Sequence, residues 1–209
     1  MAYDDEEQLE AIRAWWHQYG RMVIIALIAA LALVLGWQQW TAWQDRQAAS
    51  ASADYAAILA SLNNDDREAA GNRLQTLRES HADSPYAAMA TLAVATASLD
   101  AGEAEAAAGA LRWLTGNQPD SPMSAVARLR LAEALRVAGD DEAALEAIEP
   151  LPSGPLRPRF LELQGDLEVA LGNPGAAIDA YQQALESVSG QRRSLVEIKL
   201  LDLGGAPAS

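Results

Sequence analysis

The chain of 209 residues contains no cysteine and carries a formal net charge of −14 at pH 7, which excludes structural disulfides and cysteine-based metal sites. From Arg46 onward, 13 basic residues face 23 acidic ones, a balance of −10. A domain this acidic is a poor nucleic-acid binder, because phosphate binding needs clustered cations. Half of the residues are hydrophobic but only 6% are aromatic, which favours closely packed helices over sheets.

Residues 22–44 form a long run without any charged residue. As a helix rising 1.5 Å per residue, this run reaches about 34 Å, enough to cross a hydrocarbon core of about 30 Å. Tryptophans lie near both of its ends, as in the aromatic belts of membrane helices: Trp15 and Trp16 before it, and Trp37, Trp40 and Trp43 in its last part. The sequence therefore predicts a transmembrane helix over residues 22–44, preceded by an N-terminal segment of residues 1–21.

Two alternatives compete with this anchor, a buried core helix and a cleaved signal peptide. The uncharged run is unusually long for a soluble core, and the segment before it is acidic rather than short and basic. Arg13 and Arg21 lie on its N-terminal side and Arg46 on its C-terminal side. The excess of arginine on the N-terminal side predicts a cytoplasmic N-terminus, with the larger part of the chain on the opposite side of the membrane.

The sequence repeats itself from about residue 48 onward. Residues 83–92 resemble residues 120–129 at an offset of 37, and such periods mark arrays of helix-turn-helix units. Pro85 and Pro122 occupy the same place in the two copies, each after an Asp-Ser pair. Because proline suits the first turn of a helix, we expect both prolines to begin helices that the preceding polar residues cap.

A glycine follows each predicted first helix, at Gly102, Gly139 and Gly172, where a left-handed backbone can end the helix. Residues after these glycines are expected to cap the next helix or to stabilise its first turn: Glu103, Asp140, Asp141, Glu142 and Asn173.

The last unit is the one most similar to a tetratricopeptide repeat. Its small-small-small-aromatic-small pattern is Gly165, Gly172, Ala177, Tyr181 and Ala184. Two earlier units match less closely, and a degenerate first unit is expected around Ala70, Leu74 and Leu77. Residues 195–203 fit an amphipathic closing helix, which a repeat array needs at its end. The predicted fold is all-α: one transmembrane helix, then a tetratricopeptide-like solenoid over residues 45–209 with a C-terminal capping helix.

An acidic N-terminal segment, an arginine-flanked apolar run and tetratricopeptide-like repeats follow one another along the chain. In this order they resemble the ancillary SecYEG translocon subunit family, the YfgM-like proteins of Gram-negative bacteria. Residues 5–16, 35–37 and 197–203 carry the resemblance. It implies a single-pass inner-membrane protein with a periplasmic repeat domain, whose partners are the SecYEG channel, the periplasmic chaperone PpiD and translocated client proteins. The implied role is to help pass these clients to periplasmic chaperones. A second interpretation stays open, a membrane-tethered scaffold for another envelope assembly such as division or wall machinery.

No pattern for chemistry accompanies these repeats. His17 and His81 form no metal-binding pair, and the sequence has no phosphate-binding glycine loop or nucleophile elbow. We therefore expect no enzyme, no cofactor and no metal.

Stacked helix pairs instead form a concave binding face, lined mainly by first helices. The tetratricopeptide register places eleven residues on a protein-binding groove: Met89, Leu92, Leu99, Val126, Leu129, Glu133, Arg136, Arg159, Glu162, Asp166 and Val169. The alternative for Leu92 and Leu129 is that they belong to the core.

Overall fold

The structure, a computed structural model, describes the backbone of residues 2–206 and the side chains of residues 13, 15–22 and 24–206. The described residues form helices and no strand, which confirms the all-α prediction. They fall into two compact units, Met1–Ser50 and Ala51–Ser209.

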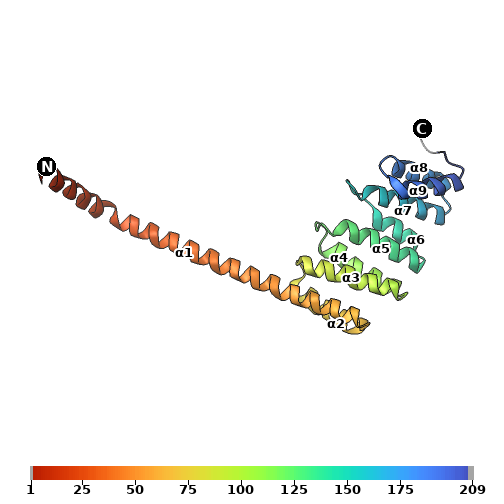
Figure 1. Cartoon of the computed structure of the whole chain (residues 1–209), viewed down its shortest axis with the longest axis horizontal. Helices are drawn as coiled ribbons and strands as arrows, with labels where there is room; N and C mark the ends of the chain where they lie inside the picture. Colours follow the sequence, from red (N-terminus) through yellow and green to blue (C-terminus); the bar gives the residue numbers. More distant parts are fainter. Residues whose placement is uncertain (1, 207–209) are drawn as a thin grey trace. The chain divides into compact units, whose positions relative to one another are not determined.

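The first unit consists of most of helix α1, which extends over Ala2–Asn63 (Figure 1). Among the described residues, α1 is the one helix long and apolar enough to cross a membrane. The predicted anchor, residues 22–44, lies within it. Its large apolar side chains are exposed, with Leu33 at 74% and Trp37 at 71%. These exposures suit a helix whose surroundings are lipid rather than protein or water.

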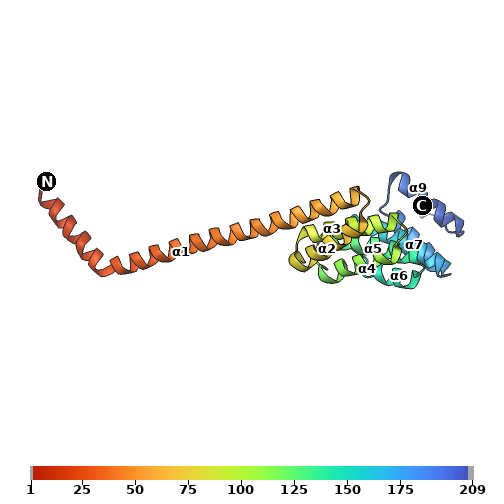
Figure 2. The ribbon, with the colours of Figure 1, turned by 90° about the horizontal axis from the view of Figure 1, so that it is seen from below.

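The second unit contains the end of α1 and eight further helices. They are α2 Arg67–His81, α3 Pro85–Asp100, α4 Ala104–Asn117, α5 Ser124–Ala138, α6 Asp141–Ile148, α7 Arg157–Ala170, α8 Pro174–Leu185 and α9 Gly190–Asp202. From α2 onward each helix packs against its neighbours in the chain. Figure 2 shows α2, α4 and α6 in one layer and α3, α5 and α7 in the other. The expected degenerate first unit is present, since Ala70, Leu74 and Leu77 are the buried residues of α2.

Left-handed glycines end the first helices as predicted. The φ angles are 78° at Gly102, 86° at Gly139 and 79° at Gly172, and Gly204, which follows α9, has 75°. In each case the glycine N–H donates to the carbonyl three residues earlier, and the next N–H donates to the carbonyl five residues before it. This repeated pattern gives α3, α5, α7 and α9 a common register.

The two proline positions behave differently. Pro85 begins α3, and the Ser84 hydroxyl caps it by accepting from the Tyr86 N–H at 3.1 Å. The same expectation for Pro122 is wrong, because α5 begins at Ser124. The Ser121 hydroxyl accepts from the Met123 N–H at 3.2 Å, so a turn takes the place of the first helical residues.

Only some of the predicted caps form. Asp140 accepts from the Ala143 N–H at 3.1 Å and caps α6. Glu103 and Asn173 occupy the equivalent positions before α4 and α8 but make no side-chain cap. The Asn173 amide instead donates to Glu168 of α7 at 2.9 Å.

Small residues let paired helices approach closely, as the repeat pattern predicted. A Cβ atom on Gly165 would lie 2.6 Å from Cδ1 of Tyr181, a distance that real Cβ atoms do not tolerate. Ala95 and Ala132 take the corresponding places in α3 and α5, and both are buried. The aromatic ring of Tyr181 therefore packs directly on the backbone of α7.

Arg78 joins three helices in the first half of the repeat domain. Its guanidinium donates from α2 to the Thr91 hydroxyl of α3 at 3.1 Å and to the Ala110 carbonyl of α4 at 3.2 Å. It also lies 4.3 Å from the ring centroid of Trp113, a cation–π contact. Burial lowers the pKa of Arg78 to about 10, so the side chain stays charged at neutral pH.

The closing helix is longer than predicted, since α9 begins at Gly190. Its Val196 and Leu200 are fully buried. Its opposite side is not wholly polar, because Leu195, Ile198 and Leu201 are 50%, 56% and 58% exposed. The expected amphipathic cap thus carries apolar residues on both its packed and its open side.

Candidate functional site

A groove of about 350 Å³ opens between α3, α5 and α7. It is lined by Leu99, Asp100, Glu133, Arg136, Val137, Arg159, Glu162, Leu163 and Asp166. All of these residues belong to the first helices of their pairs, which is where a tetratricopeptide-like array carries its concave surface.

The structure brings six of the eleven predicted groove residues to this groove: Leu99, Glu133, Arg136, Arg159, Glu162 and Asp166. The other five lie outside it: Met89, Leu92, Val126, Leu129 and Val169. Leu129 is 8% exposed and belongs to the core, and Leu92 packs against the same core. These positions match the alternative that the sequence left open for the two leucines, a place in the core or against it.

Three lining residues were not predicted: Asp100, Val137 and Leu163. Asp100 and Val137 each lie two residues before a helix-ending glycine. Counting back from that glycine would have found both positions. In the part of the chain that the structure describes, Asp100 and Arg136 have no ion-pair partner within 4.0 Å.

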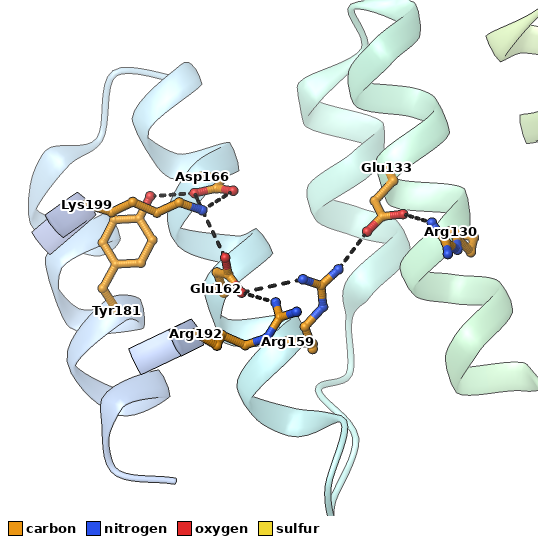
Figure 3. Close-up of polar contacts among 8 residues, drawn as sticks. All are labelled: Arg130, Glu133, Arg159, Glu162, Asp166, Tyr181, Arg192 and Lys199. Carbon is orange, nitrogen blue, oxygen red and sulfur yellow. Dashed lines mark hydrogen bonds and ion pairs between the residues drawn. The ribbon is translucent and has the colours of Figure 1, made fainter. Parts of the chain in front are cut away.

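The other charged residues of the groove belong to one network, drawn in Figure 3: Glu133, Arg159, Glu162 and Asp166. On α5, Glu133 accepts from Arg130 at 2.9 Å and from Arg159 of α7 at 3.1 Å. Arg159 also lies 3.7 Å from Glu162, one turn further along α7. The guanidinium of Arg159 therefore links the carboxylates of two successive repeats.

Glu162 is the most buried charge of the network, with its side chain 11% exposed. It accepts from Arg192 at 2.9 Å and from Lys199 at 3.1 Å, both on α9. Burial alone would raise the pKa of Glu162. The hydrogen bonds from Lys199 and Arg192, together with the charges of Lys199 and Arg159, outweigh burial and hold this pKa below its ordinary value.

Asp166 completes the network between α7, α8 and α9. The hydroxyl of Tyr181 donates to it at 2.7 Å, and the Lys199 ammonium donates to its two carboxylate oxygens at 2.7 and 2.8 Å. Burial, and next the hydrogen bond to Asp166, raise the pKa of Tyr181. The phenol is thus fixed as a neutral donor, and Asp166 is fully engaged within the protein.

These contacts leave apolar surface and charged side chains next to each other in the groove. Leu99, Val137 and Leu163 supply apolar surface, while Asp100 and Arg136 supply one charge of each sign. The residues that the structure describes contain no group of three His, Cys, Asp or Glu that could hold a metal ion. The arrangement can accept a protein segment that carries apolar and charged side chains together.

Comparison with known proteins defines the class of this chain. Residues 13–205 match the family model described as a tetratricopeptide repeat-like domain, and the chain belongs to that family. It is also similar to the ancillary SecYEG translocon subunits of Haemophilus influenzae, at 26% identity, and of Aggregatibacter actinomycetemcomitans, at 29%. Each similarity spans 205 residues, 97% of this chain and 100% of the relative. The resemblance found in the sequence is confirmed.

Solved structures agree with the fold. Pseudomonas aeruginosa pilF matches with a TM-score of 0.56 at 19% identity, over 75% of this chain and 68% of its own. A protein of Podosopora anserina, whose own TPR-like repeats are nearly identical to one another, matches with a TM-score of 0.55 at 15% identity, over 75% of this chain and 86% of that protein. At these identities the likeness concerns the fold alone.

Proposed function

We propose that this chain is a non-enzymatic accessory subunit of the SecYEG translocon, and that it binds partner proteins through the groove between α3, α5 and α7. The full-length similarity to two ancillary SecYEG translocon subunits carries the proposal. The groove supports it, because free charges and apolar surface lie side by side there. Such mixed surfaces are typical of sites that recognise protein segments.

The proposed topology follows the distribution of charge around the apolar run. Residues 22–44 cross the bacterial inner membrane, residues 1–21 remain in the cytoplasm, and residues 45–209 form a periplasmic domain. The length of α1, the exposure of its apolar side chains and the arginine excess on its N-terminal side support this arrangement. Protease added to spheroplasts should digest the repeat domain, and its protection would contradict the topology.

The proposed partners are the SecYEG channel, the chaperone PpiD and newly translocated clients. A domain tethered beside the channel meets such clients as they emerge, so the groove would hold them while a periplasmic chaperone takes over. A groove of about 350 Å³ accommodates a few side chains, which suits brief contact with an extended segment rather than with a folded domain.

Site-specific photo-crosslinking tests this function. A photoreactive residue at Val137 or Arg136 reports on the groove, and one at the exposed Asp179 of α8 is the matched control outside it. We expect products with SecYEG subunits, PpiD or secreted clients from the groove and few from the control. Exclusive capture of division or wall-synthesis proteins would favour the alternative, a scaffold for another envelope assembly.

A further inference from the structure

The closing helix α9 has one continuous open face. Its exposed residues recur at helical spacing: Gln191, Ser194, Leu195, Ile198, Leu201 and Asp202. The three large apolar side chains occupy the middle of this face and are each at least half exposed. Exposed apolar patches of this kind mark interaction sites more often than scattered single residues do.

The cations of α9 point away from that face. Arg192 and Lys199 pair with the carboxylates of α7, and Arg193 pairs with Glu197 at 2.8 Å. Asp202 is the only ionisable residue on the open face. Interfacial membrane helices carry Lys and Arg around their apolar side, so this face is poorly suited to an anionic lipid surface.

The common register relates this face to the groove. Six residues before the helix-ending glycine lie Glu133 in α5, Asp166 in α7 and Ile198 in α9. Three residues before the same glycine, Leu201 takes the position of Arg136 in α5. Ile198 and Leu201 thus hold the positions at which α5 lines the groove, and Leu195 lies beside them on the same open face.

The apolar face is not the place where a further repeat helix would pack. Ala95, Ala132 and Gly165, seven residues before their glycines, are buried in their helix pairs. The equivalent residue of α9 is Glu197, which Arg193 neutralises. A polar ion pair therefore covers that side of α9, as a capping helix requires, while the apolar residues continue the groove side.

We propose that Leu195, Ile198 and Leu201 extend the protein-binding groove and hold the apolar side chains of a cationic segment from another protein. The proposal rests on the function proposed above, because it concerns the same groove. Residues 51–209 carry 12 Lys and Arg against 23 Asp and Glu, a balance of −11, which attracts a cationic partner.

A second copy of this chain fits the face less well. Two copies would bring domains of the same net charge together. Three half-exposed side chains offer only a few hundred Å² of apolar surface, whereas a stable dimer buries about 800 Å² on each partner. A small apolar patch beside a charged groove suits a short cationic segment instead.

The test uses the full chain in nanodiscs and a fluorescent amphipathic peptide of about 18 residues built from Leu and Lys, read by anisotropy. A matched peptide carries Glu in place of Lys. Replacing Leu195, Ile198 and Leu201 together by Ser should weaken binding of the Lys peptide roughly tenfold, while helicity and thermal unfolding remain unchanged. The Glu197→Gln variant, on the other side of α9, should bind like the parent chain.

A groove variant, Leu99→Ser with Val137→Ser, separates this inference from the proposed function. Weakening by both the groove and the α9 variants supports the extended groove. If only the groove variant weakens binding of the Lys peptide, the role of α9 is overturned and the proposed function stays intact. If only the α9 variant weakens it, the idea that α9 and the groove form one binding surface is overturned. No weakening by either contradicts both proposals, and equal binding of the Glu peptide overturns the cationic partner.

Two other occupants of this face are the lipid surface and a second copy of this chain, and the cysteine-free sequence allows a direct check of both. The Ile198→Cys variant carries a single thiol, to which a fluorophore is attached. Spin-labelled lipid in the nanodisc should not quench the fluorescence of this label. Nor should the unlabelled thiol form a crosslinked dimer with a second copy. Quenching would reassign the face to the membrane, and a crosslinked dimer would reassign it to self-association, so either result overturns the proposal.

Discussion

Lys199 of α9 donates to both carboxylate oxygens of Asp166 on α7, at 2.7 and 2.8 Å (Figure 3). The same ammonium donates to Glu162 at 3.1 Å. One side chain of the closing helix therefore bridges two carboxylates of the last repeat, and α9 depends on this contact for its position as well as on the burial of Val196 and Leu200.

Replacing Lys199 by Met should lower the free energy of unfolding by about 1 to 2 kcal/mol. Hydrogen bonds to charged groups contribute about 1.5 to 3 kcal/mol, but the Lys199 side chain is 33% exposed and solvent screening reduces its share. Urea denaturation followed by circular dichroism measures the loss. Arg130→Gln is the control, because among the described residues that exposed side chain pairs only with Glu133, and its effect should stay within about 0.5 kcal/mol. Equal losses would contradict a special role for Lys199.

Acid should destabilise the repeat domain through Glu162. The pKa of this carboxyl is lowered in the folded protein, so its stabilising contribution is fully present above its unfolded pKa of about 4.3. That contribution is lost as pH falls from this value through the folded pKa. Unfolding free energies measured from pH 7 down to pH 3.5 should therefore fall less in Glu162→Gln than in the parent chain. Parallel pH profiles would count against this assignment.

Gly165→Ala should destabilise the last repeat, because the new Cβ would overlap the ring of Tyr181. Overpacking of this kind costs about 1 to 3 kcal/mol. The matched control is Gly109→Ala in α4, where a Cβ meets nothing within 4 Å; it should stabilise the helix by about 0.5 to 1 kcal/mol. Thermal unfolding of both variants checks the opposite signs, and a stabilised Gly165→Ala would show that Tyr181 moves aside freely.

Arg78→Met should loosen the first half of the repeat domain. The substitution removes the hydrogen bonds to Thr91 and Ala110 and the contact with Trp113, and we expect a loss of about 2 kcal/mol. Hydrogen exchange should quicken in α2, α3 and α4 more than in α7 and α8. Arg73→Gln is the control on the same helix, since Arg73 is exposed. Uniform quickening across all helices would contradict a local role.

Local signals in the sequence were sufficient for the helix pairs. The glycines at the ends of α3, α5 and α7 act within one turn of the backbone, so Gly102, Gly139 and Gly172 could be assigned without tertiary information. The same signal failed at Pro122. There the Ser121 hydroxyl formed a competing turn, and a local pattern does not show which of two local hydrogen bonds will form.

The candidate groove was only partly predictable. Transferring the repeat register found Glu133, Arg136 and Asp166, because position in a repeat determines which side of a helix a residue occupies. It also placed Leu92 and Leu129 in the groove, where the structure has them against the core. The tilt of each helix decides whether a leucine at the edge of the face points inward, and tilt depends on the volumes of neighbouring side chains.

By itself the sequence determined an uncharged run long enough for a membrane, a helical repeat array, and the resemblance to ancillary SecYEG translocon subunits. The first two follow from composition, period and backbone chemistry, which act over short stretches of chain, whereas the resemblance rests on residues 5–16, 35–37 and 197–203. Only the tertiary structure decided that Lys199 reaches Glu162, 37 residues away, and that Leu195, Ile198 and Leu201 remain open. Both depend on how α9 packs onto α7 and α8, and the apolar and charged residues of α9 taken alone allow more than one such packing.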